Sequence, residues 1–236
     1  MTSADEVAPI ANAIDGWLSE AQGRALFAAA TKCSGRGAIV EIGSWKGRST
    51  TWLAHGAKTR GLHVYAVDPH VGSREDPAAR TFELFIENVR DAGVLDAVHP
   101  LVMTSAEAAR TLSEPVELLF LDGDHSLTGA THDARVWLPR VVVGGTGMFH
   151  DVATSGYEGP RRMFQRMVCR SRAFHRVGRV GSMAIAERTG RRSFAQAIRS
   201  MAFDLLLYRY DLEGILKRGL RSLRRRAMSQ LPTASN

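Results

Sequence analysis

Four carboxylate side chains stand at or just inside the ends of short apolar runs: Glu41, Asp68, Asp122 and Asp151. If these runs are parallel strands of one sheet, their carboxyl ends lie at the same edge, where open α/β sheets bind ligands. Four carboxylates at one edge repel one another unless they meet hydrogen-bond donors, a cation or a ligand. A helix N-cap or a turn explains any one of them. For all four together, we expect a ligand site at this edge.

A glycine-containing turn follows the first of these runs. Residues 38–49 read A-I-V-E-I-G-S-W-K-G-R-S, so a buried strand leads through Gly43 and Gly47 into a segment with helical spacing. Glycine at both positions lets the backbone approach a ligand closely. The helix start that follows presents unpaired N–H groups to such a ligand. Taken alone, the stretch also fits an ordinary strand–turn–helix corner.

Strand and helix patterns alternate along most of the chain. Five apolar runs are expected to form parallel strands, and a final antiparallel pair follows them. The predicted fold class is α/β: a doubly wound, Rossmann-like sheet of seven mostly parallel strands with one antiparallel strand and helices on both faces. Residues 1–13 have little pattern and are expected to form a loose arm. The expected strands cover residues 38–42, 62–67, 99–102, 116–121, 141–149, 173–177 and 182–187.

The positive charge is concentrated near the C-terminus. The 236-residue chain has a net charge of +7, but residues 188–226 hold eleven Lys or Arg against three Asp or Glu, a net +8. Residues 1–187 therefore carry −1, which argues against nucleic-acid binding by the main domain. Only Cys33 and Cys169 are present, and no signal-peptide or membrane-spanning pattern is visible. A cytoplasmic protein without disulfides is expected.

The basic segment has a helical pattern of its own. We therefore divide the chain into a main domain, residues 1–190, and a C-terminal extension, residues 191–236. Apolar residues of the extension recur at 4-3 spacing, which predicts a helix with one apolar seam, interrupted at Gly214 and Gly219. Three partners for this seam stay open: the protein's own domain, a second subunit, or an anionic membrane surface. The seam consists of Phe194, Ile198, Met201, Leu205, Tyr208, Leu212 and Ile215.

Asp68 is placed to bind a ribose. It ends the second expected strand, 25 positions after Gly43, where dinucleotide enzymes carry the carboxylate that accepts hydrogen bonds from the ribose. The dinucleotide turn needs G-x-G-x-x-G, whereas Gly43 and Gly47 are separated by three residues. A ligand with a ribose but no phosphate fits this spacing better, and S-adenosylmethionine is such a ligand.

At this point the sequence resembles a known family. Residues 41–49 (E-I-G-S-W-K-G-R-S) are similar to the first motif of class I S-adenosylmethionine-dependent methyltransferases. They are most similar to the small metal-dependent O-methyltransferases of the catechol type. Residues 121–126 (L-D-G-D-H-S), the pair Gly144-Gly145 and residues 149–151 (F-H-D) resemble a bacterial branch. That branch includes macrolide-sugar O-methyltransferases and cephalosporin-hydroxylase-like proteins, and the resemblance covers about residues 17–187.

The resemblance implies roles for individual residues. His125 matches the general base, and Asp122, His150 and Asp151 match the metal site. The family usually carries a carboxylate at the position of His150, so its imidazole favours a softer ion such as Mn²⁺ over Mg²⁺. For both histidines an alternative stays open, in which the imidazole only orients neighbouring side chains and neither takes a proton nor binds the metal. The implied contacts of the cofactor are Glu41, Gly43, Ser44, Trp45, Gly47, Ser49, Asp68 at the ribose, Ser105 by the adenine, and Asp122.

The expected function is S-adenosylmethionine-dependent O-methylation, assisted by a divalent cation. The expected acceptor is a hydroxyl of a small molecule of secondary metabolism, such as a sugar, a polyketide or a lipid-linked glycoside. Two alternatives stay open: a membrane- or partner-docked protein that binds the nucleoside without catalysis, and an RNA methyltransferase. The confined positive charge argues against RNA, so no nucleic-acid partner is expected.

Further contacts are expected at the extension and at two loops. If the seam of the extension is not buried against its own domain, we expect it to provide either a homo-oligomer contact or a peripheral contact with the inner membrane face. Residues 72–77 and 155–162 are expected to be loops long enough to border the acceptor. For Tyr157, in the second loop, solvent exposure is preferred over acceptor contact.

Overall fold

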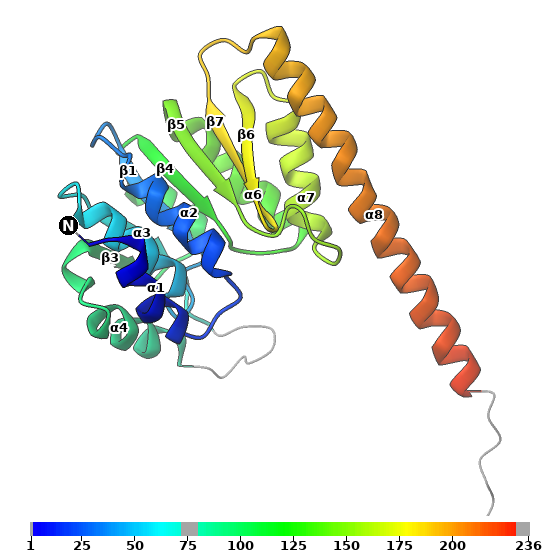
Figure 1. Cartoon of the computed structure of the whole chain (residues 1–236), viewed down its shortest axis with the longest axis horizontal. Helices are drawn as coiled ribbons and strands as arrows, with labels where there is room; N and C mark the ends of the chain where they lie inside the picture. Colours follow the sequence, from blue (N-terminus) through cyan, green and yellow to red (C-terminus); the bar gives the residue numbers. More distant parts are fainter. Residues whose placement is uncertain (1, 72–79, 230–236) are drawn as a thin grey trace, which may run out of the picture.

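One sheet of seven strands forms the centre of the computed structural model (Figure 1). The structure describes residues 2–71 and 80–229, so the loop expected at residues 72–77 lies outside the described residues. The strands are β1 (Ala38–Ile42), β2 (Val64–Val67), β3 (Val98–Leu101), β4 (Val116–Leu121), β5 (Val141–Phe149), β6 (Phe174–Val180) and β7 (Met183–Arg188). Their order in the sheet is β3-β2-β1-β4-β5-β7-β6.

The direction of the strands follows the prediction. All pairs among β1 to β5 are parallel, whereas β7 is antiparallel to both of its neighbours, β5 and β6. The predicted fold class, a mostly parallel sheet of seven strands with one antiparallel strand, is therefore confirmed. Because β1, β2, β4 and β5 are parallel, their carboxyl ends lie at one edge of the sheet.

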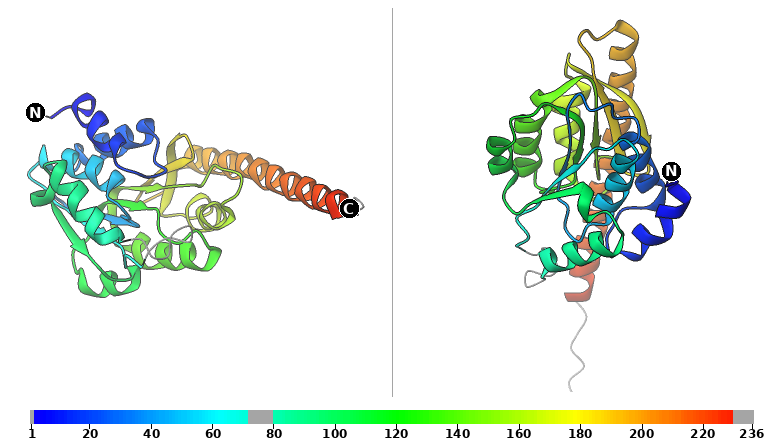
Figure 2. Two further views of the ribbon diagram at one scale, coloured as in Figure 1. Left: turned by 90° about the horizontal axis from the view of Figure 1, so that it is seen from below. Right: turned by 90° about the vertical axis from the view of Figure 1, so that its left-hand side faces the viewer.

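Helices cover both faces of the sheet (Figures 1 and 2). Successive residues of β4 pack into two hydrophobic cores on opposite faces of the sheet: Leu118 and Phe120 on one face, and Leu119 and Leu121 on the other. A strand buried on both faces is apolar at successive positions, which explains the apolar run in β4. The first face is covered by α1 (Ala4–Ala13), α2 (Glu20–Ala30), α3 (Arg48–Lys58) and α4 (Thr81–Asp91), and the second by α5 (Ser105–Thr111), α6 (Leu127–Trp137), α7 (Glu158–Phe164) and α8 (Phe194–Ser229). Three short helical turns complete the chain: η1 (Leu95–Ala97), η2 (Leu138–Arg140) and η3 (Gln165–Cys169).

The N-terminal segment is a helix, so the expectation of a loose arm is wrong. The side chain of Ser3 accepts a hydrogen bond from the Glu6 N–H, and the Glu6 carboxylate accepts one from the Ser3 N–H. This capping box starts α1, whose Val7 and Ala11 are buried against α2 and α3. Small side chains hide the helical period, but the Ser–Glu spacing of the capping box was a usable signal.

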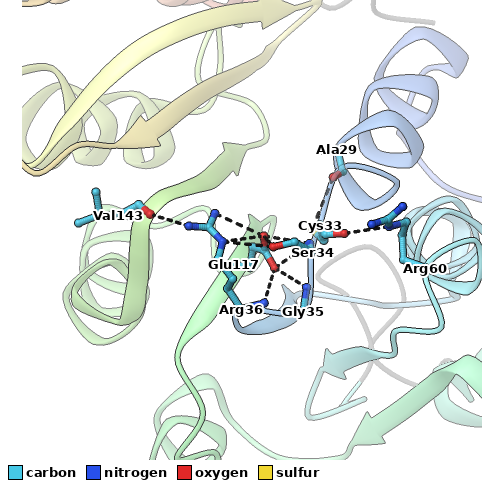
Figure 3. Close-up of polar contacts among 8 residues, drawn as sticks. All are labelled: Ala29, Cys33, Ser34, Gly35, Arg36, Arg60, Glu117 and Val143. Carbon is cyan, nitrogen blue, oxygen red and sulfur yellow. Dashed lines mark hydrogen bonds and ion pairs between the residues drawn. The ribbon is translucent and has the colours of Figure 1, made fainter.

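Glu117, the one acidic residue of β4, lies near the start of that strand. Figure 3 shows its carboxylate enclosed by the turn between α2 and β1. It accepts hydrogen bonds of 2.9 to 3.1 Å from the backbone N–H groups of Ser34, Gly35 and Arg36. Burial alone would raise its pKa, but these hydrogen bonds outweigh burial and lower the pKa. Glu117 therefore fixes the turn that leads into β1.

Most of the described part of the C-terminal extension forms one continuous helix, α8 (Phe194–Ser229), which projects beyond the sheet domain (Figures 1 and 2). The interruptions expected at Gly214 and Gly219 are wrong, because a glycine inside a helix costs only about 1 kcal/mol relative to alanine and does not by itself end it. The division of the chain at residue 190 stays a prediction. Within the described residues, no helix is both long and apolar enough to cross a membrane.

Candidate active site

Three non-glycine residues with left-handed backbone follow three of the strand ends. Trp45 (φ 43°) follows β1, His70 (φ 51°) follows β2, and Asp151 (φ 53°) follows β5. The left-handed conformation is uncommon for non-glycine residues and costs about 1–3 kcal/mol for each of them. Residues that adopt it cluster at functional sites. All three lie at the edge of the sheet where the four carboxylates were predicted to meet.

Two carboxylates and two imidazoles meet at the ends of β4 and β5. The Oδ2 atom of Asp151 lies 3.1 Å from Nε2 of His125 and 3.3 Å from Nδ1 of His150. The Oδ1 atom of Asp122 lies 3.2 Å from Nδ1 of His150 and 3.6 Å from Nε2 of His125. Asp122, His125 and Asp151 each offer a ligand atom, and these atoms lie within 4.8 Å of one another. The residues predicted as base and metal site are therefore neighbours.

The charges of this cluster shift the pKa values of its members. For His150, burial lowers the pKa, but the charge of Asp122 and the hydrogen bonds to both carboxylates outweigh burial and raise the pKa to about 10. For His125, the bond to Asp151 and the charges of both carboxylates likewise outweigh burial and raise the pKa. Burial raises the pKa of Asp151, but the two imidazoles hold it well below its usual range. At neutral pH, the His150 imidazolium therefore balances charge between the carboxylates.

Asp68 connects the ends of β1 and β2. Its Oδ2 accepts a hydrogen bond of 2.9 Å from the Trp45 N–H, and its Oδ1 accepts one of 2.7 Å from the His70 N–H. These bonds fix the carboxylate, and each oxygen keeps a lone pair for a further donor. Nearby in the sequence, Ser44 Oγ and Trp45 Nε1 are buried without a hydrogen-bond partner. Buried polar atoms without a partner are rare, and a bound ligand would satisfy them.

Glu41 is fully buried between β1 and α3. Burial raises its pKa to about 8; the charges of Asp122 and Asp68 add to the rise, and hydrogen bonds from Ser49 and Thr50 oppose it. Its Oε2 accepts from the Thr50 hydroxyl, whereas its Oε1 is buried without a partner. Glu41 is therefore a neutral acid at pH 7, and it does not add to the repulsion that was expected among the four carboxylates.

The two glycines of the turn are required by the protein's own packing. A Cβ on Gly43 (φ 90°) would lie 2.2 Å from the carbonyl oxygen of Asp122. A Cβ on Gly47 (φ 89°) would lie 3.1 Å from Val89, and Gly47 is also the N-cap of α3. We expected these glycines to leave room for a ligand, but the contact between β1 and β4 and the shape of the turn already explain them.

Two aromatic residues join the site through contacts that the sequence did not indicate. The ring of Trp17 stacks on that of Trp45 with centroids 4.6 Å apart, although Trp17 is 69% exposed. The ring of Tyr157, expected in a solvated loop, packs against that of His125 with centroids 4.5 Å apart. Each pair is separated by about 30 residues in the sequence, so no local pattern links its members.

Ser105 has contacts of a different kind. Its hydroxyl accepts a 2.9 Å hydrogen bond from Nε1 of Trp137 and also bonds to the Asp133 side chain. Its place beside an adenine stays a prediction.

Of two cavities in the described structure, one adjoins the cluster of Asp122, His125, His150 and Asp151 and the other does not. A cavity of about 20 Å³, lined by Asp122, His125 and His150 among others, adjoins the cluster. It has room for about one water molecule. A larger cavity of about 400 Å³ lies near the starts of β1 and β2, and it contains none of the predicted site residues. The cluster at the strand ends, and not the larger cavity, is therefore the candidate site.

The side chains of the site fit the two predicted groups. For a nucleoside cofactor, the fixed oxygens of Asp68 and the unpartnered hydroxyl of Ser44 offer an acceptor and a donor. For a divalent cation, Asp122 and Asp151 offer oxygen, and His125 or His150 offers nitrogen. This mixed donor set suits Mn²⁺ or a similar transition ion better than Mg²⁺. His150 would have to lose a proton from Nδ1 to bind the ion.

Comparison with known proteins agrees with this description. A family model described as a methyltransferase domain matches residues 40–152. Among solved structures, cofactor-bound Rv0187 from MTB has a TM-score of 0.60 at 22% identity, over 78% of this chain and 87% of that chain. The O-methyltransferase from Bacillus cereus in complex with SAH has a TM-score of 0.58 at 19% identity, over 78% and 90%. The O-methyltransferase TomG from Streptomyces achromogenes, in complex with SAM, has a TM-score of 0.58 at 21% identity, over 79% and 89%.

The extent of these likenesses differs. The family match contains the end of β1, the turn after it and β2 to β5, and therefore most of the candidate site. The solved structures share the fold over about four fifths of the chain. The family match over residues 40–152 supports the predicted resemblance to methyltransferases, and the solved structures show that the chain shares their fold.

Proposed function

We propose that this protein transfers a methyl group from S-adenosylmethionine to a hydroxyl of a small molecule, with a divalent cation assisting. The observation that carries the proposal is the convergence of Asp122, His125, His150 and Asp151 beside the turn after β1. The family match supports methyl transfer, and the donor set of the cluster supports the cation. The solved O-methyltransferases with SAM or SAH bound support the choice of cofactor and of oxygen as the acceptor atom.

The cofactor and the cation would contribute distinct chemistry. S-adenosylmethionine, when bound, supplies a methyl group on a positively charged sulfur, and a divalent cation, when bound, lowers the pKa of an acceptor hydroxyl. Asp68 would hold the ribose, and Ser44, Trp45 and Ser49 would contact the methionine half. Holding both reactants in line is worth several kcal/mol, up to about 7–11.

His125 is suited to take the proton of the acceptor. If its Nε2 donates to Asp151, Nδ1 is the nitrogen left to accept a proton. Asp151 then orients the ring and stabilises the imidazolium that forms, as the acceptor oxygen bonds the methyl carbon and the sulfur leaves as a neutral thioether. Asp122, Asp151 and His150 would hold the cation in this arrangement. If His125 is a ligand instead, its removal should weaken cation binding.

The partners and location follow from the same reasoning. We propose a small hydroxylated acceptor of secondary metabolism, such as a sugar, a polyketide or a lipid-linked glycoside, and no nucleic acid. Tyr157 borders the cluster through its contact with His125, and we propose that it contacts this acceptor. We further propose a cytoplasmic enzyme that also contacts the inner membrane face. A protein that binds the nucleoside without catalysis is disfavoured, because such a protein has no need of the His125–Asp151 pair.

A transfer assay with labelled S-adenosylmethionine tests the proposal. A panel of sugars, polyketides and catechols is offered with excess chelator, and Mn²⁺ or Mg²⁺ is then added back. We expect label in an acceptor only with cation present, more with Mn²⁺ than with Mg²⁺, and no recovery in Asp151→Ala. Full turnover in chelator would contradict cation assistance while leaving methyl transfer intact. Labelled RNA in place of labelled small molecules would contradict the proposed acceptor class.

A further inference from the structure

Helix α8 has two apolar faces, and only one of them packs against the sheet domain. Phe203 and Leu207 are buried in the core beside α7 and β6. Ser200 and Gly214 are buried on the same face. Of the three partners left open for the seam predicted from the sequence, the protein's own domain is excluded, because Phe194, Met201 and Leu205 are exposed. The 4-3 spacing identifies an apolar face but does not say which face of a helix meets the domain.

Ion pairs fix the orientation of α8. The guanidinium of Arg161, which is buried in α7, donates hydrogen bonds of 2.9 and 2.6 Å to Asp211. Arg170 pairs with Asp204 at 3.1 Å. Because these contacts and the buried apolar residues lie on the same side of α8, the opposite face points away from the domain.

The outward face is apolar over more than six turns. Phe194 is 83% exposed, Leu205 70% and Leu216 65%. Isolated exposed apolar residues are ordinary, but a continuous row along one helix marks an interaction surface. The side chain of Ile215 lies outside the described side chains. The described outward face, which we call the outer seam, consists of Phe194, Ile198, Met201, Leu205, Tyr208, Leu212 and Leu216. Tyr208 lies at its edge, since its hydroxyl accepts a hydrogen bond of 3.0 Å from Arg170 of the sheet domain.

The outer seam lies within a strongly basic part of the molecule. Residues 158–236 contain 18 Lys and Arg but only 5 Asp and Glu, a net charge of +13, whereas residues 1–157 carry −6. The basic region is thus larger than the extension alone, because it includes exposed arginines of η3 and β6 such as Arg166 and Arg179. All three acidic residues of α8 are paired with arginines of this chain: Asp204, Asp211 and Glu213.

We propose that the outer seam of α8 docks this protein onto an anionic lipid surface. An amphipathic helix that is basic outside its apolar face binds at the headgroup boundary, where apolar burial and attraction to anionic lipid add together. A second copy is a poorer occupant, because pairing two outer seams places two regions of +13 beside each other. The acidic residues that could offset this charge in α8 are already engaged within each copy.

Co-sedimentation of the full-length protein with vesicles tests this proposal without any measurement of activity. We expect sedimentation at low salt with vesicles of mixed phosphatidylglycerol and phosphatidylcholine, and little with phosphatidylcholine alone. At about 1 M salt, where the Debye length falls to about 3 Å, binding to the anionic vesicles should be strongly reduced. Equal binding to both kinds of vesicle would contradict the role of the positive charge.

Paired variants locate the surface. Met201→Glu/Leu205→Glu changes only exposed positions, so the packed face of α8 stays intact, which a thermal melt checks. This variant should lower partitioning onto anionic vesicles by at least about ten-fold, since two apolar side chains are lost from the boundary. Val102→Glu/Val143→Glu makes the same type of change at exposed positions of the sheet domain and should bind as the unmodified protein does. If both variants lose binding equally, general charge and not the outer seam controls it, and the proposal is wrong.

Light scattering tests the alternative that a second copy of the chain, and not a lipid surface, covers the outer seam. The proposal predicts a monomer whose mass is unchanged by Met201→Glu/Leu205→Glu. A dimer that this variant converts to a monomer, together with no sedimentation on anionic vesicles, would assign the outer seam to a second copy instead.

Discussion

At the candidate site, burial and charge act against each other on the titratable side chains. Among the described residues, no cation lies beside Glu41, so burial dominates and raises its pKa to about 8. Asp151 is also buried, but it lies between two imidazoles, which hold its pKa well below the usual range. The site therefore holds one neutral carboxyl on β1 and one firmly ionised carboxylate after β5, with β4 between these two strands. Each state leads to a measurable consequence.

Glu41→Gln should change the pH dependence of stability. Between the unfolded pKa of 4.5 and the folded pKa of about 8, the folded protein keeps a proton that the unfolded chain has lost. The stability of the unmodified protein should therefore fall, by up to a few kcal/mol, as the pH rises through this window. Glutamine does not titrate, so urea denaturation at pH 5 and pH 8 should show a smaller fall. The exposed Glu87→Gln serves as the control; if it and Glu41→Gln have the same pH slope, Glu41 is not the buried acid described here.

His125→Ala should lower turnover by roughly 10²–10⁴-fold, because a positioned base contributes about that much. The affinities for S-adenosylmethionine and for the cation, measured by calorimetry, should stay nearly unchanged. His132→Ala, an exposed histidine on α6, is the matched control and should keep full turnover. A loss of cation affinity as large as the loss of rate would make His125 a ligand and not the base.

The residues of the cluster were predictable because strand ends in a parallel sheet share an edge. Asp122, His125, His150 and Asp151 were all named from the sequence, and they lie together in the structure. Trp17 and Tyr157 were not predictable, because each reaches the site through a loop whose path depends on the tertiary fold. The neutral state of Glu41 also depends on complete burial under α3, which the pattern of β1 alone does not reveal.

At the scale of elements, α7 links α8 to the candidate site. Besides its bonds to Asp211, Arg161 donates hydrogen bonds of 2.7 Å to the Thr154 carbonyl and 3.2 Å to the Tyr157 carbonyl. The ring of Tyr157 packs against His125. The same guanidinium therefore holds both α8 and the loop that borders the site.

Asp211→Ala should destabilise the protein by about 3–5 kcal/mol, since it leaves the buried guanidinium of Arg161 without its counter-charge. Glu213→Ala is the control on the same helix. Its partner, Arg209, lies 3.5 Å away and is 65% exposed, so the cost should stay within about 1 kcal/mol. Urea denaturation of both variants measures the difference. Equal and small effects would show that Arg161 does not depend on Asp211.

The strands were easier to predict than the ends of the chain. β1 and β4 have the expected bounds, because a short apolar run between turn residues has few other solutions. The N-terminal helix was missed because its buried residues are mostly alanine. For α8, the helix was predicted, but which face packs depends on the partner surface of α7 and β6, and this is not encoded in the helix itself.

At the scale of the whole molecule, the candidate active site and the net positive charge lie in different parts of the chain. The residues of the predicted chemistry lie within residues 41–157, where the net charge is negative, whereas residues 158–236 have a net positive charge. The fold class and the edge of the site were predictable from the alternation of strands and helices. The sequence analysis located the positive charge from residue 188 onward. The contacts of α8 with η3 and β6 are the reason for extending the basic region back to residue 158.

Calorimetric titration with S-adenosylmethionine tests the central claim most directly, since it needs neither the acceptor nor the cation. The unmodified protein should show saturable binding at one site. Asp68→Ala should bind about ten- to hundred-fold more weakly, the loss expected for hydrogen bonds to a charged group, whereas the exposed Asp91→Ala should bind normally. No saturable binding by the unmodified protein, or equal affinity in folded Asp68→Ala, would contradict the assignment of this edge of the sheet as the cofactor site.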